Sequence, residues 1–125
     1  AHQHYLVRQE KTLELLKSLN LPRNSKILEL GFGGAQTAKK ILDMGFLYYG
    51  IDISEHLCDY AKIFCKNYVD QNKADFKVAS LENIYNFDNE FFDVVVESES
   101  VVCLLVRIVH GFVLSCLRGF RKLIK

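Results

Sequence analysis

The sequence has no tryptophan and a single proline, Pro22, among its 125 residues. So little proline excludes a long proline-rich linker. Charge of one sign is also scarce, because 16 Lys and Arg are balanced by 15 Asp and Glu, for a formal net charge of +1. This balance excludes a strongly basic nucleic-acid groove as a property of the whole chain, so we expect no nucleic-acid partner. Half of the residues are hydrophobic, which excludes a disordered chain and suits one domain with its own core.

Paired metal-binding cysteines are absent as well. The four cysteines are Cys58, Cys65, Cys103 and Cys116. Their spacing contains no CxxC pair, so we expect no metal site. Each lies in an apolar stretch, where a reduced, buried thiol is the usual state, and this favours a cytoplasmic protein.

The longest apolar run, Val101–Leu117, is too short for a membrane-spanning helix, which needs about 20 residues. It also holds Arg107 near its centre, which is costly inside a bilayer. We therefore expect no membrane association, and we predict that this run forms a helix packed on a sheet.

Apolar runs alternate with helical periodicity along the chain. An amphipathic helix (5–19) and a loop (20–25) are expected first, so residues 1–25 form an N-terminal helix and loop and residues 26–125 the main domain. Strands are predicted at Lys26–Leu30, Leu47–Ile53, Asp75–Ala79 and Phe91–Glu97. Helices are predicted at Gln36–Met44, Glu55–Tyr68 and the C-terminal apolar run. This alternation predicts an α/β fold, a three-layer Rossmann-like parallel sheet flanked by helices.

A glycine-rich segment, ELGFGGAQT, begins at Glu29, directly after the first predicted strand and before a helix. Glycines there permit a tight turn and let a ligand approach the backbone closely. Asp52 ends the second predicted strand about 20 residues later, where a carboxylate accepts hydrogen bonds from ribose hydroxyls in nucleotide-binding βαβ units. The pattern therefore predicts a nucleotide-type ligand at this turn.

Two features argue against a dinucleotide. Gln36 stands at the sixth position, where the dinucleotide fingerprint GxGxxG has glycine. Glu29 would oppose a pyrophosphate, whereas it would suit a ligand with an ammonium group. An NAD site and a glycine turn that binds nothing remain the alternatives at this point.

The segments ELGFGGA and GIDIS, the latter at residues 50–54, resemble the first two motifs of class I S-adenosylmethionine-dependent methyltransferases. NFDNEFFDVVV at 86–96 and LRGFRKLIK at 117–125 resemble that family's fourth-strand region and the helix after it. The resemblance covers about residues 26–125. It implies S-adenosylmethionine as cofactor and about four of the family's usual seven strands, as in a chain truncated at its C-terminus.

The resemblance also implies roles for single residues. Glu29 would meet the cofactor's ammonium group directly or through water, Asp52 would hold the ribose, and Ile53 would lie beside the adenine. Ser80 stands where the family usually has an acidic residue near the adenine. The full set of cofactor-binding candidates is Glu29, Gly31, Phe32, Gly33, Gly34, Ala35, Asp52, Ile53, Ser80 and Leu81.

Methyl transfer needs a general base only where the acceptor must lose a proton, and Glu97 and Glu99 are the catalytic candidates, with His110 as a third. The single proline excludes the Pro-containing motifs of the family's DNA-methylating enzymes, so we expect a small-molecule acceptor. A non-catalytic nucleotide-binding module and an NAD-dependent oxidoreductase are the competing functions. An exposed sheet edge or the apolar C-terminal helix would also allow a homodimer.

Overall fold

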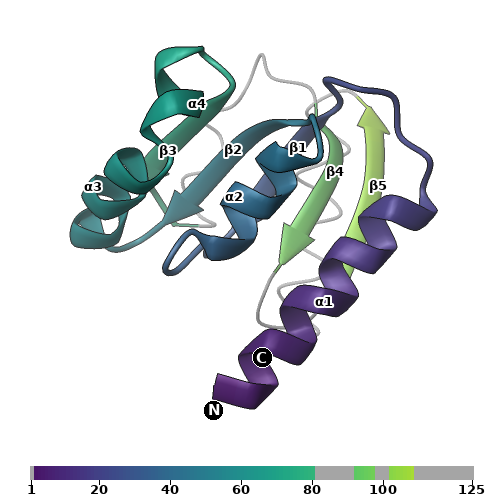
Figure 1. Ribbon diagram of the computed structural model, residues 1–125, viewed down its shortest axis with the longest axis horizontal. Coiled ribbons are helices and arrows are strands. Elements are labelled where there is room, and N and C mark those ends of the chain that lie inside the picture. Colours follow the sequence, from purple (N-terminus) through teal and green to yellow (C-terminus); the bar gives the residue numbers. More distant parts are fainter. Residues whose placement is uncertain (1, 81–91, 98–101, 109–125) are drawn as a thin grey trace.

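The computed structural model describes residues 2–80, 92–97 and 102–108, which form an α/β arrangement (Figure 1). The helices are α1 His2–Ser18, α2 Gln36–Asp43, α3 Glu55–Phe64 and α4 Lys66–Asp70. The strands are β1 Lys26–Leu30, β2 Leu47–Asp52, β3 Ala74–Val78, β4 Phe92–Glu97 and β5 Val102–Ile108. The four strands expected from the sequence are therefore present, with ends that differ by one residue at most.

All five strands belong to one sheet in the order β3-β2-β1-β4-β5. Strands β1 to β4 are parallel, which confirms the predicted Rossmann-like parallel sheet. The central strand β1 pairs with β2 on one side, with Glu29 opposite Gly50, and with β4 on the other, with Glu29 opposite Val96. Strand β1 is buried on both faces, as is usual for a central parallel strand.

One face of the sheet carries the main core. Helices α1 and α2 cross in front of the strands in Figure 1, and α3 lies beside β3. Buried residues of α1, α2 and α3 form one cluster with residues of β1 to β4, among them Leu16, Ile41, Cys58, Tyr48 and Phe76. On the opposite face, Leu28, Leu30, Ile51 and Val95 are buried too. The second helical layer of the predicted three-layer arrangement falls on residues outside the described ranges.

The N-terminal helix α1 is held against α2 by apolar and polar contacts. Leu16 is fully buried in the main core. The side-chain amide of Gln9 donates a hydrogen bond of 3.2 Å to the hydroxyl of Thr37, and both side chains are buried. Because Thr37 lies in the first turn of α2, this bond ties α1 to the part of α2 that follows the glycine turn.

The prediction of a helix beginning at Val101 is wrong for the described residues, because Val102–Ile108 form strand β5. Strand β5 runs antiparallel to β4, with Val96 opposite Cys103 and Glu97 opposite Val102. The run is rich in Val and Ile, whose branched side chains favour strands when a partner strand is at hand. The edge of β4 that faces away from β1 is therefore paired with β5. Residues 102–108 form a strand, so they cannot supply the apolar helix that was expected as a dimer surface.

The helix predicted over Glu55–Tyr68 is divided in two. Cys65, with φ −106° and ψ 28°, ends α3 and begins α4. Its thiol is free and buried in the main core. None of the helices in the described part of the chain is long and apolar enough to cross a membrane.

Candidate functional site

The order in which the strands are added reverses direction at β1. The chain runs from β1 outward to β2 and β3, and then returns to the other side of β1 as β4. In open α/β sheets, ligands bind at such a reversal, outside the carboxyl ends of the strands. The glycine turn follows β1 there, Asp52 ends β2, and Glu97 ends β4. The topology therefore gathers three of the predicted site elements at one edge of the sheet.

The turn between β1 and α2 uses left-handed backbone at three positions. Gly31, Gly33 and Ala35 have φ angles of 75°, 56° and 66°. The N–H of Gly31 donates to the carbonyl of Ile51 at 2.8 Å, and the N–H of Ala35 donates to the carbonyl of Phe32 at 3.1 Å. Within the described ranges, a Cβ placed on Gly31 or Gly33 would meet no heavy atom within 4 Å. These two glycines thus present bare backbone to open space, as close approach by a ligand requires.

Asp52 joins this turn to the helix on its far side. Its Oδ2 accepts a hydrogen bond from the N–H of Gly33, and its Oδ1 accepts one from the N–H of Ser54, both at 3.1 Å. The hydroxyl of Ser54 in turn caps α3 by accepting from the N–H of Leu57 at 3.1 Å. These two hydrogen bonds fix the position of the carboxylate. Asp52 is only half-buried, so part of it stays accessible.

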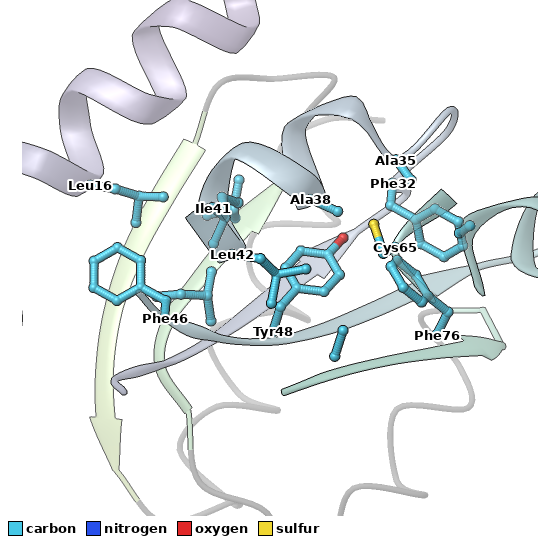
Figure 2. Packing of buried hydrophobic residues seen from close by; sticks show 14 of the residues in the cluster. Leu16, Phe32, Ala35, Ala38, Ile41, Leu42, Phe46, Tyr48, Cys65 and Phe76 are labelled. Atoms are coloured by element: carbon cyan, nitrogen blue, oxygen red, sulfur yellow. The ribbon is translucent and has the colours of Figure 1, made fainter. Parts of the chain in front are cut away.

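Beneath the turn lies a buried acid. Glu29 is fully buried, and its Oε1 accepts a hydrogen bond of 2.5 Å from the hydroxyl of Tyr48, which is fully buried as well. Burial and the neighbouring Glu29 charge raise the pKa of Tyr48 well above its usual value, so this hydroxyl keeps its proton and donates. Figure 2 shows the Tyr48 ring below α2, among Ala38, Leu42 and Cys65.

Space for this pair depends on Gly50. A Cβ at Gly50 would lie 2.7 Å from the Tyr48 hydroxyl and 2.8 Å from Cδ2 of Phe32. The Phe32 ring packs edge-to-face on Phe76, with centroids 5.0 Å apart. Tyr48 was not identified from the sequence, and Gly50 was identified only as the first residue of the GIDIS segment, without a role of its own. The available signal was a glycine inside a strand, which often marks close approach by another group.

The other predicted site residues differ in how far they are exposed. Phe32 and Ala35 are buried in the main core, so only their backbone faces the turn. Ile53 is 78% exposed just after Asp52, and Ser80 is half-buried after β3. Gly34 lies within the turn and is exposed. Leu81, Glu99 and His110 lie outside the described residues.

Glu97 lies at the carboxyl end of β4 and is half-buried. It is paired in register with Leu30, whereas Glu29 is paired with Val96. Because side chains alternate along a strand, Glu97 belongs to the face of the sheet opposite that of Glu29. Among the described residues, no group of three or more His, Cys, Asp or Glu is placed to hold a metal ion.

The site is thus a strand, a turn with left-handed glycines and a helix, and the turn is hydrogen-bonded to the acid at the end of the next strand. Known proteins share this chain's features as follows. A family model of a methyltransferase domain matches residues 28–121, three quarters of the chain. The chain belongs to this methyltransferase family. Its sheet is the Rossmann-like sheet of the class I, S-adenosylmethionine-dependent enzymes, as the sequence resemblance implied.

Solved structures agree on the fold of this methyltransferase domain. A TehB-like SAM-dependent methyltransferase from Corynebacterium glutamicum is 26% identical, with a TM-score of 0.54, over 70% of this chain and 43% of that one. Magnesium protoporphyrin IX methyltransferase from Synechocystis, solved with bound SAM, is 22% identical, with a TM-score of 0.59, over 75% of this chain and 43% of that one. The chain thus spans less than half the length of these two structures. No curated protein sequence matches it.

The residues at the turn fit a nucleoside cofactor with an amino-acid group. The open space over Gly31 and Gly33 is a cradle that side chains at those positions would fill. Asp52 presents a fixed carboxylate beside that cradle. S-adenosylmethionine, when bound, supplies an activated methyl group on a sulfonium. In S-adenosylmethionine-dependent enzymes, holding the methyl donor and the acceptor in line is worth on the order of 7–11 kcal/mol.

Proposed function

We propose that this chain binds S-adenosylmethionine at the Gly31–Ala35 turn and transfers its methyl group to a small-molecule acceptor. The observation that carries the proposal is the bond between Asp52 Oδ2 and the N–H of Gly33, which places the predicted ribose-binding acid against the glycine turn. The match to a methyltransferase domain supports the same reaction class.

In this proposal each element has a task that its position supports. Both Asp52 oxygens already accept backbone N–H groups, yet each carboxylate oxygen has a second lone pair for a ribose hydroxyl. Ile53 offers an exposed apolar side chain to the adenine. Glu29 is too deeply buried for an open approach from solvent, so we assign it an indirect electrostatic effect on the cofactor's ammonium group.

We assign the acceptor side of the site to Glu97, because it is the last residue of β4, the strand that pairs with β1. It would act as general base where the acceptor must lose a proton. Acceptors that are already nucleophilic need alignment alone. We place the protein in a reducing compartment, the cytoplasm, which the free, buried thiols of Cys58 and Cys65 support.

The test is calorimetric titration of the chain with S-adenosylmethionine, S-adenosylhomocysteine and NAD. We expect the first two to bind and NAD not to bind. A preference for NAD would replace the proposal with an oxidoreductase. Single-turnover transfer of a labelled methyl group to a panel of metabolites then separates an enzyme from a non-catalytic module, since a module binds the cofactor and methylates nothing.

A further inference from the structure

We propose that Tyr48 is a positioning residue of the cofactor site: its hydroxyl fixes the Glu29 carboxylate beneath the glycine turn, so that the site selects ligands carrying an ammonium group. The inference rests on the proposed function, because it assigns a selectivity to that same site. Tyr48 does not touch the ligand and acts through Glu29.

The first support is the geometry of the pair. The hydroxyl of Tyr48 lies 2.5 Å from Oε1 of Glu29, and neither side chain is exposed. O–H···O bonds of 2.5–2.7 Å are typical where the acceptor is an ionised carboxylate. A hydrogen bond donated to a carboxylate favours its charged form and so opposes the effect of burial. The bond from Tyr48 therefore fixes the Glu29 carboxylate at one place in the fold and favours its negative charge.

The second support is independent of that distance and comes from Gly50. Gly50 faces Glu29 in the β1–β2 register and follows Tyr48 by two residues on the same face of β2. Any side chain there would strike the Tyr48 hydroxyl or the Phe32 ring, at 2.7 and 2.8 Å from the Cβ. The residue without a side chain, Gly50, therefore lies where the Tyr48 hydroxyl reaches Glu29.

The third support is location. Glu29 lies in the strand that leads into the turn, two residues before Gly31, the first left-handed glycine. Charges interact more strongly across a poorly solvated core than across water. A fixed anion this close in the chain to the turn therefore favours a cationic group bound there. The thioether and nucleoside parts of a ligand carry no charge and do not gain from this anion.

Among the described residues, Glu29 is the acid that is hydrogen-bonded to Tyr48. The other titratable groups that act on Tyr48 are Asp52, at the end of β2, and Cys65, between α3 and α4. Burial raises the pKa of Cys65 to about 11, so its thiol is neutral at ordinary pH. The buried residues that α2 and β4 contribute to this cluster are apolar: Ala35, Ala38, Ile41, Leu42, Val94 and Val96.

The experiment compares two ligands on three proteins. S-adenosylhomocysteine carries the ammonium group, and 5′-methylthioadenosine is the corresponding thioether nucleoside without the amino-acid part. For Tyr48→Phe we expect about tenfold weaker binding of S-adenosylhomocysteine, because Glu29 without its donor is less well held in place and less favoured in its charged form, and little change for 5′-methylthioadenosine. Tyr60→Phe, which removes the hydroxyl of a half-exposed ring on α3, is the matched control and should leave both affinities unchanged.

Two further readouts separate positioning from mere packing. The dependence of S-adenosylhomocysteine affinity on pH should differ between the wild type and Tyr48→Phe, because the Glu29 carboxylate has lost a donor to its charged form. Adding Tyr48→Phe to Glu29→Gln should cost no further selectivity, since the charge is already gone.

Each outcome decides the matter. Equal weakening of both ligands by Tyr48→Phe, or an unchanged pH profile, makes Tyr48 a packing residue and overturns the inference while leaving the proposed function in place. Failure of the wild type to bind either ligand overturns the proposed function itself. If Tyr48→Phe does not fold, Tyr48→Met, which also lacks the hydroxyl but fills much of the space, undergoes the same comparison.

Discussion

At Ala35, a strained backbone conformation and a buried methyl group make opposite contributions to the stability of the fold. It is fully buried in the main core and yet holds a left-handed backbone, φ 66° and ψ 13°, as the residue before α2. A left-handed conformation costs an L-residue with a Cβ roughly 1–2 kcal/mol. Ala35→Gly relieves that strain and makes the turn fully glycine-like.

The same change removes two sources of stability. A buried methyl contributes about 0.8 kcal/mol. Glycine also makes the unfolded chain more flexible, which costs about 0.4–1 kcal/mol. The losses nearly offset the relief, so we expect the free energy of unfolding of Ala35→Gly to lie within about 1 kcal/mol of the wild type.

Ala38→Gly is the matched control, because Ala38 is equally buried but lies within α2. Glycine in a helix costs about 1 kcal/mol, and the buried methyl adds about 0.8 kcal/mol. No strain is relieved, so we expect a loss of about 1.5–2 kcal/mol. Urea unfolding followed by circular dichroism measures both variants. Equal losses would refute the reasoning, because they would mean that Ala35 is not strained.

Four further predictions follow from the site and the core. Asp52→Ala should weaken S-adenosylhomocysteine binding by about 1.5–3 kcal/mol in calorimetry, and unchanged affinity in a folded variant would remove Asp52 from the site. Gly33→Val should abolish that binding, since a β-branched residue tolerates neither positive φ nor close approach, and normal binding would make the turn a mere connector. Gly50→Ala should lower the free energy of unfolding by about 1–3 kcal/mol through overpacking against Tyr48, and a neutral result in urea would contradict the clash. Between pH 9 and 11 stability should fall as pH rises, because burial raises the native pKa of Cys65 to about 11 and the unfolded thiol ionises first; Cys65→Ala should flatten this decline in pH-dependent melts.

Local signals were enough to predict the half of the fold that carries the site. Lys26–Leu30 is a short run rich in Ile and Leu that stops at glycine, and the structure has β1 over those residues. Helix α3 begins after Ser54, whose hydroxyl accepts from the N–H of Leu57, and serine is a residue type that commonly precedes a helix in this way. The glycine turn and Asp52 were predicted to act together, and the bond from Gly33 to Asp52 now joins them. In the first two cases the signal lies within a few residues of the feature, and in the third the known spacing of the glycine turn and the acid spans the 19 residues between Gly33 and Asp52.

The failures concern features that depend on partners distant in sequence. An apolar run such as that after Val101 suits a buried helix or a strand equally, and only pairing with β4 decides for β5. The Glu29–Tyr48 bond joins residues 19 apart and requires the β1–β2 register, which periodicity does not reveal. The division of the helix at Cys65 carries no proline or glycine signal in the sequence.

The strand order also has a consequence for the sequence of folding events. The contact of Glu29 with Tyr48 closes a loop of 19 residues, whereas the N–H of Lys26 meets Asp93 Oδ2 across 67 residues. The longer closure costs about 1 kcal/mol more chain entropy. The unit formed by β1, α2 and β2 should therefore assemble early, with β4 docking onto a β1 edge that is already in place. A newly made chain would then expose that edge, with its unpaired N–H and C=O groups, until β4 arrives, and this interval is when it is most open to pairing with another chain.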